Sequence, residues 1–275
     1  MISRLLRRWE YAAVLDSGDI AVAGVNDNRK LENIEHSVKL IDDKYKKIKC
    51  DFVLDHDDYD IATLEVPAVP KVELVRALEW EAKKIFGDGD DKLIFDFYYQ
   101  PSSKSYSKEM INAVAVEKSL VDDVKNKALK ENIFLKKITV PEMIYKDSCQ
   151  YLNSESGVCF IIVNGNLGKV VVVEKKEVCF SRKFNLSYDK GVAYESLLLL
   201  EVQRSLDYCE RQYNMKIPSF LCVLGDVVTD SVIEVIKSNV STNVSVGLSS
   251  SHFPGESHLS SDQRLLLCVS CLSRM

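Results

Sequence analysis

Three consecutive runs of β-branched and aromatic residues constrain the fold of this chain more than any other feature. They span residues 158–163, 169–174 and 178–182, and short turns built from Asn, Gly and Lys separate them. Apolar runs of this kind, joined by short turns, predict an antiparallel meander of strands. A long helical pattern follows, from about residue 190 to residue 214.

The start of the chain repeats this pattern in a shorter form. Residues 11–15 are apolar, Asp16-Ser17-Gly18-Asp19 is a turn, and residues 20–25 are the returning strand. Two hairpins, each followed by alternating helices and strands, predict an α/β fold built from two related halves, residues 1–153 and 154–275. Within the first half, the helix–strand–strand–helix–strand–helix pattern of residues 66–152 predicts an inserted α/β subdomain.

Composition narrows the function classes. With 275 residues, 46% of them hydrophobic and 28% charged, the sequence is that of a globular chain with room for two domains. The net charge of −5 gives no electrostatic basis for a nucleic-acid partner. No apolar run approaches the ~20 residues of a membrane-spanning helix. Several of the eight cysteines fall inside predicted strands, as expected for a protein of the reducing cytoplasm.

Three polar segments are weak candidates for sites. The acidic turn Asp55-His56-Asp57-Asp58 has metal-ligating side chains, but its flanking strands favour a solvated turn. Cys268-Val-Ser-Cys271 is a single C-x-x-C pair, which favours core cysteines over a redox or zinc site. The basic, amphipathic first ten residues fit either an anionic membrane surface or a solvated terminus. Spacing alone predicts no catalytic machinery.

Three segments together resemble a known family. They read LEVPAVPKVELVRALEW (64–80), ITVPEM (138–143) and EVQRSLDYCERQ (201–212). In this order and spacing they resemble the PilM-like proteins of type IV pilus assembly, and among these the MshI proteins of mannose-sensitive haemagglutinin (MSHA) pili. The resemblance covers nearly the whole chain. It implies the actin-like fold, a duplicated ribonuclease H-like α/β architecture of two domains with a subdomain inserted in the first.

The resemblance also points to a nucleotide site. Actin-like ATPases hold phosphates between two hairpin turns, where backbone N–H groups and hydroxyls surround the phosphates and carboxylates hold hydrated Mg²⁺. The first turn of this chain is short and its serine is displaced, and the second has neither carboxylate nor hydroxyl. We therefore expect a vestigial site, no ATPase activity and no bound cofactor, with binding of ATP and Mg²⁺ as the alternative. The residues concerned are Asp16, Ser17, Gly18, Asn164, Gly165, Asn166, Gly225 and Asp226.

The function implied by the resemblance is that of a non-catalytic scaffold in the cytoplasm, at the inner face of the bacterial inner membrane. Its partners would be the N-terminal tail of a PilN-like inner-membrane protein and the pilus assembly ATPase. In the family the tail groove lies beside the inserted subdomain, near residues 95–99 of this chain. The candidate partner-binding residues there are Pro67, Pro70, Glu73, Arg76 and Trp80.

Other interpretations stay open at this stage. Trp80 also suits the buried core of its helix, since an apolar helix face commonly buries its aromatic residue. An ATP-binding switch with actin-like closure is the main functional alternative. A small-molecule kinase of the same fold is another, but it needs a catalytic acid where the sequence has Asn164 and Asn166.

Overall fold

A computed structural model describes twelve segments of the chain. For the following residues within these segments the structure describes only the backbone: those before 51, residues 212, 213 and 220, and residues 243–246. The segments are residues 10–16, 19–25, 31–33, 48–87, 92–101, 109–149, 157–174, 176–187, 193–213, 220–225, 229–240 and 243–246.

The first sheet has five strands in the order β3-β2-β1-β4-β8. The antiparallel strands β1, β2 and β3 come first in the chain, and β4 and β8 then add parallel to β1. Residues 31–33 pair with β2 as a short third strand. The strands are β1 (Glu10–Asp16), β2 (Asp19–Val25), β3 (Leu31–Asn33), β4 (Ile48–Val53) and β8 (Ile133–Thr139).

The second sheet has the same architecture. Its order is β11-β10-β9-β12-β13, again with three antiparallel strands followed by two parallel ones. The meander predicted at residues 158–182 is confirmed, and the two sheets share one strand order, which agrees with two related halves. The strands are β9 (Val158–Asn164), β10 (Leu167–Glu174), β11 (Glu177–Asn185), β12 (Phe220–Gly225) and β13 (Asn243–Val246).

A third, smaller sheet contains β5 (Tyr59–Glu65), β6 (Leu93–Tyr99) and β7 (Met110–Glu117) in the order β5-β7-β6. Helix α1 (Lys71–Phe86) packs on β5 and β7. This sheet begins before residue 66, and β8, which lies within the range predicted for the insertion, pairs with β4 of the first sheet. The strands of the small sheet therefore do not coincide with the predicted range 66–152.

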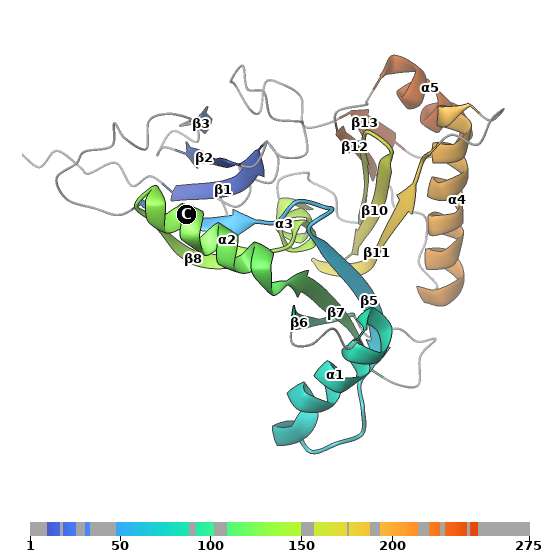
Figure 1. The fold of residues 1–275 in the computed structure, drawn as a ribbon. Coiled ribbons are helices and arrows are strands. Elements are labelled where there is room, and N and C mark those ends of the chain that lie inside the picture. Colours follow the sequence, from blue (N-terminus) through green and yellow to red (C-terminus); the bar gives the residue numbers. More distant parts are fainter. Residues whose placement is uncertain are drawn as a thin grey trace, which may run out of the picture.

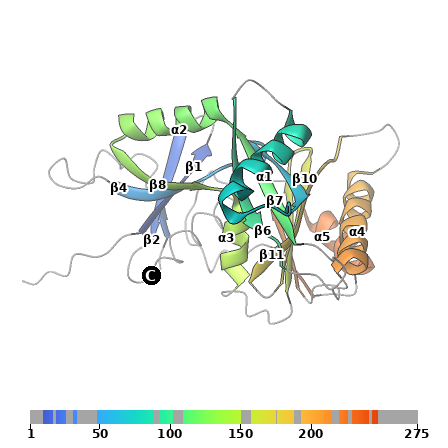
Figure 2. The same ribbon diagram turned by 90° about the horizontal axis from the view of Figure 1, so that it is seen from below.

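Four further helices cover the sheets. Helix α2 (Lys118–Lys130) packs on β8 and β7, while α4 (Tyr194–Tyr213) and α5 (Asp230–Asn239) pack on each other beside the second sheet. Figure 2 shows α4 and α5 at the opposite end of the molecule from α2. Helix α3 (Pro141–Ser148) has proline at its first position, where the missing N–H is not needed. It packs against β10 and β11, and lies between the two large sheets in Figure 1.

Because successive strand residues point to opposite faces, each face of the second sheet has its own layer. Ile161, Val163, Val170 and Val172 belong to the core under α4 and α5. Phe160 points the other way, and its ring stacks on Tyr145 of α3 at 4.8 Å between centroids. The second sheet is thus buried on both faces, which explains its nearly uninterrupted apolar runs.

Candidate functional site

The first predicted nucleotide turn is described only at its ends. Asp16 is the last residue of β1 and pairs with Asp19, the first residue of β2, so the two strands form the predicted hairpin. Ser17, Gly18 and Asp226 lie outside the described residues. Their expected role in a vestigial phosphate site stays a prediction.

Two backbone carbonyls of the second turn accept hydrogen bonds from residues of the same half. The Asn166 carbonyl accepts a hydrogen bond from the Leu186 amide at 2.7 Å, and the Gly165 carbonyl accepts one from the Tyr194 hydroxyl at 2.9 Å. Gly225 lies against this turn: a Cβ there would approach the side-chain oxygen of Asn164 to 2.8 Å. The structure therefore brings together Asn164 and Gly225, two of the predicted nucleotide residues.

A cavity of about 500 Å³ borders this turn. Asn164, Asn166 and Lys183 line it from the second half, and Asp57 reaches it from the acidic turn after β4. The Lys183 ammonium is already engaged, because it donates a hydrogen bond to the Tyr59 carbonyl and lies 3.9 Å from Asp60. The cavity is polar, but its lysine is bound to protein groups.

The predicted partner-binding residues lie along α1 and the segment before it. Pro70, Glu73 and Arg76 are exposed, and Trp80 is 61% exposed with the Lys84 ammonium 3.1 Å from its ring centroid. The core alternative for Trp80 is therefore wrong. Leu78 and Ala82 form the buried face of this helix instead.

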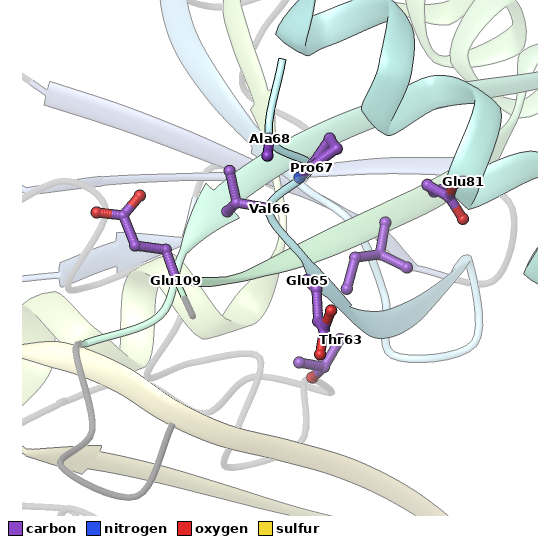
Figure 3. Close-up of a pocket in the computed structure, with 8 residues that line it drawn as sticks. Thr63, Glu65, Val66, Pro67, Ala68, Glu81 and Glu109 are labelled. Atoms are coloured by element: carbon purple, nitrogen blue, oxygen red, sulfur yellow. The ribbon is translucent and has the colours of Figure 1, made fainter. Parts of the chain in front are cut away.

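Pro67 lines a separate cavity of about 710 Å³ beside the start of α1. Figure 3 shows Val66, Pro67 and Ala68 in the segment that leads from β5 to α1, with Glu81 approaching from the helix. Glu65, Glu81 and Glu109 give the cavity an acidic rim. Of the five predicted partner-binding residues, only Pro67 borders this cavity.

An apolar groove lies on the other face of the small sheet. Phe95 and Phe97 of β6 pack toward α1, whereas Tyr98 packs with α2 and β8 on the opposite face. Between this face and the segments α2, β8 and α3 is a groove of about 370 Å³. The predicted strand 95–99 therefore borders the groove, while the exposed side of α1 is turned away from it. Its apolar lining includes Leu54, Ile94, Tyr98, Val114, Val121 and Met143.

A buried polar cluster connects the two halves. Glu142 of α3 and Lys169 of β10 have no exposed surface, and their charged atoms lie 2.5 Å apart. The Glu142 carboxylate also accepts hydrogen bonds from the Tyr59 hydroxyl at 2.6 Å and from the Ser181 hydroxyl at 2.7 Å. The Lys169 ammonium donates a further hydrogen bond to the Tyr59 hydroxyl.

Burial and the contacts within this cluster shift the pKa values of Glu142, Tyr59 and Lys169. Burial alone would raise the pKa of Glu142, but the Lys169 charge and the hydrogen bonds from Lys169, Tyr59 and Ser181 outweigh it and lower the pKa from 4.5 to about 2. Burial raises the pKa of Tyr59 well above its usual value, and the Glu142 charge adds to this. Burial lowers the pKa of Lys169, and Glu142 opposes that shift. The arrangement favours a carboxylate beside an ammonium.

The acidic turn differs from its predicted form at one residue. Asp55 and Asp57 are exposed, but His56 is buried, with Nε2 3.1 Å from the Tyr145 hydroxyl. Within the described segments, no group of three or more His, Cys, Asp or Glu side chains is arranged to hold a metal ion. Cys268 and Cys271 and the first nine residues lie outside these segments.

Sequence reasoning missed the polar cluster. Lys169 begins the apolar run Val170–Val173, and a lone charge next to such a run was the available signal. Glu142 lies inside one of the three segments that carry the family resemblance, but no sequence pattern links it to Lys169. Their meeting depends on how α3 packs against β10.

Comparison with known proteins supports the fold. No protein-family model and no curated protein matches the sequence. Among solved structures, a PilM–PilN type IV pilus biogenesis complex matches with a TM-score of 0.68 over 98% of this chain and 98% of that chain, at 11% sequence identity. These values show a shared fold between distant sequences.

Two further solved structures agree. The cytoplasmic domain of EpsL, an inner-membrane component of the type II secretion system of Vibrio cholerae, matches with a TM-score of 0.55 at 11% identity, covering 97% of this chain and 95% of that chain. A Bacteroides thetaiotaomicron protein with an actin-like ATPase fold and unknown function matches with 0.54 at 10% identity, covering 97% and 98%. The predicted actin-like fold is confirmed. Among the helices described, none is long and apolar enough to span a membrane.

Proposed function

We propose that this chain is a non-catalytic scaffold of type IV pilus assembly that docks the cytoplasmic tail of a PilN-like inner-membrane protein. The observation that carries the proposal is the apolar groove between the small sheet and the segments α2, β8 and α3. The fold shared with the solved PilM–PilN complex supports it. In this proposal the protein is of the MshI type, acts at the cytoplasmic face of the inner membrane, and helps position the assembly ATPase.

The lining of the groove favours an apolar segment as the ligand. Ile94, Val114, Val121 and Met143 offer aliphatic surface, and Tyr98 adds an aromatic ring. At about 370 Å³ the groove has room for a few side chains, not for a folded domain. A short tail that buries alternate side chains fits these dimensions.

Strand β6 gives such a tail a backbone partner. The backbone N–H of Gln100 donates a hydrogen bond to the Met110 carbonyl, and the backbone N–H of Lys118 donates one to the Lys92 carbonyl. By the alternation of an antiparallel pair, the backbone groups of Phe95 and Tyr99 then point away from β7, toward the edge of the described sheet. An extended tail beside this edge would gain main-chain hydrogen bonds there, while its side chains enter the groove.

The test is the binding of a synthetic peptide with the N-terminal tail sequence of the PilN-like protein from the same organism. Ile94 lines the groove and is 38% exposed, so Ile94→Glu places a charge in the groove without removing a core residue. We expect fluorescence anisotropy to show roughly 10- to 100-fold weaker binding, because the charge loses hydration when the tail covers it.

Ile85→Glu is the matched control. Ile85 is 54% exposed on α1, outside the groove, so this variant should bind the peptide like the wild type. Equal binding by the wild type and a folded Ile94→Glu variant would contradict docking in the groove.

The second candidate is an ATP-binding switch in the same machine. The polar cavity beside Asn164, Asn166 and Lys183 is the observation that favours it. Calorimetric titration with Mg·ATP separates the two candidates, since only the switch requires binding.

A further inference from the structure

The polar cluster around Glu142 and Lys169 joins segments that are distant in the sequence. Tyr59 begins β5 and Glu142 lies in α3, while Lys169 lies in β10 and Ser181 in β11. Every hydrogen bond to the Glu142 carboxylate therefore comes from a different element. Three strands, one from the first half and two from the second, therefore contribute hydrogen bonds to one side chain.

The two charges are buried, so their contact depends on geometry. A buried carboxylate and ammonium are stable only while each is paired and hydrogen-bonded, because water no longer solvates them. Glu142 and Lys169 meet this condition at 2.5 Å, with no exposed surface on either side chain. Rotation of α3 relative to β10 would have to break this pair and let water into the interior.

A second contact lies beside the first. The Lys183 ammonium donates to the Tyr59 carbonyl and lies 3.9 Å from Asp60, so β11 also holds the start of β5. A single contact would permit pivoting around it, whereas this second contact and the stacking of Tyr145 on Phe160 leave no free axis of rotation. Lys183 also lines the cavity beside Asn164 and Asn166 of the second predicted nucleotide turn.

From these contacts we infer a built-in lock: Glu142, Lys169, Tyr59 and Lys183 hold the two halves of the chain in one fixed orientation without a nucleotide. Protein charges thereby bridge the halves next to the second predicted nucleotide turn. The lock is independent of what binds the apolar groove, so it stands or falls separately from the proposed function.

The test measures the distance between the halves. Spin labels are introduced as a noncanonical amino acid at Asn126 of α2 and Gln203 of α4, because the chain has eight native cysteines. Both positions are exposed and helical. We expect one narrow distance distribution by double electron–electron resonance, unchanged by millimolar Mg·ATP. A shift of the wild-type distribution on addition of Mg·ATP would overturn the lock.

Lys169→Met removes the ammonium and keeps most of the apolar stem. We expect a broadened distribution and a melting temperature lower by roughly 10 °C, since breaking one side of a buried pair leaves a charge without its partner. Arg182→Met is the control: Arg182 pairs with Glu201 at 2.6 Å, inside the second half, so this variant should keep the narrow distribution.

A milder variant keeps the test decisive should Lys169→Met fail to fold. Tyr59→Phe removes the hydrogen bond from Tyr59 to Glu142 and the one that Tyr59 accepts from Lys169, and it leaves the charge pair in place. It should broaden the distribution of spin-label distances measurably, but less than Lys169→Met does. If either variant is folded, as shown by circular dichroism, and keeps the wild-type distribution, the cluster does not set the orientation of the halves and the inference is wrong.

Discussion

Gly225 lies so close to Asn164 that no other residue fits at its position. A Cβ on Gly225 would come within 2.0 Å of the neighbouring Val163 carbonyl and 2.8 Å of the Asn164 side-chain oxygen, and the backbone φ is +126°. Both residues were predicted as remnants of a nucleotide site. The close parallel pairing of β12 with β9 is sufficient to explain this glycine without a nucleotide.

Gly225→Ala should therefore destabilise the protein whether or not ATP is present. We expect a loss of roughly 2–4 kcal/mol in the free energy of unfolding, from a strained φ and a steric clash with backbone atoms. Urea denaturation monitored by circular dichroism measures it. Gly165→Asn is the control, because Gly165 has φ +55° with open space around it and asparagine tolerates that conformation. A Gly225→Ala variant as stable as the wild type would refute the packing explanation.

The buried pair predicts a specific response to acid. Glu142 has a pKa near 2 in the folded protein and 4.5 as its reference value, so its contribution to stability is present above pH 4.5 and is lost as the pH falls toward 2. In Glu142→Gln this dependence is absent, and the stability of the variant should fall less steeply than that of the wild type between pH 4.5 and pH 3.

Glu177→Gln serves as the comparison in the same denaturation series. Glu177 forms a half-exposed pair with Lys146 at 3.3 Å, for which we expect little contribution. Its acid dependence should follow the wild type. Parallel curves for the wild type and Glu142→Gln would show that folding does not shift the pKa of Glu142, and would contradict the lowered value.

Charge reversal on α1 separates the two candidate docking surfaces. Glu73 and Arg76 are both exposed on the side of α1 that faces away from the groove. With docking in the groove, the Glu73→Lys/Arg76→Glu variant should pull down the PilN-like partner as well as the wild type does. Loss of the partner in this variant, with normal binding by Ile94→Glu, would assign the tail to α1 and to the residues first predicted for it.

We expect the chain to have no ATPase activity. The second turn offers Asn164, Gly165 and Asn166 and thus has neither a carboxylate for hydrated Mg²⁺ nor a hydroxyl for phosphate. Phosphate release by the wild type should equal that of Asp16→Ala, the variant without the first-turn carboxylate. Turnover that disappears in Asp16→Ala would show that the shortened turns still form a working site.

Local patterns were sufficient to predict the antiparallel hairpins that begin the two large sheets. The hairpins at residues 10–25 and 158–185 are read from short continuous apolar runs and short turns, and these depend only on neighbouring residues.

Pairing between distant segments could not be read in the same way. Strand β5 pairs with β7, which lies far along the chain, so that Ile61 is opposite Val114. No pattern in the neighbouring residues indicates this partner. The same limit applies to the site. Whether Trp80 or Leu78 faces the core depends on how α1 sits on β5 and β7, since the helix has apolar residues on more than one side.

The most direct test of the scaffold account is calorimetric titration of the purified chain with the tail peptide of its PilN-like partner, with and without saturating Mg·ATP. The account predicts the same dissociation constant in both titrations, because a fixed frame needs no nucleotide to present its groove, and no heat of binding from Mg·ATP alone. Tail binding that occurs only with Mg·ATP present would contradict it and establish an ATP-dependent switch.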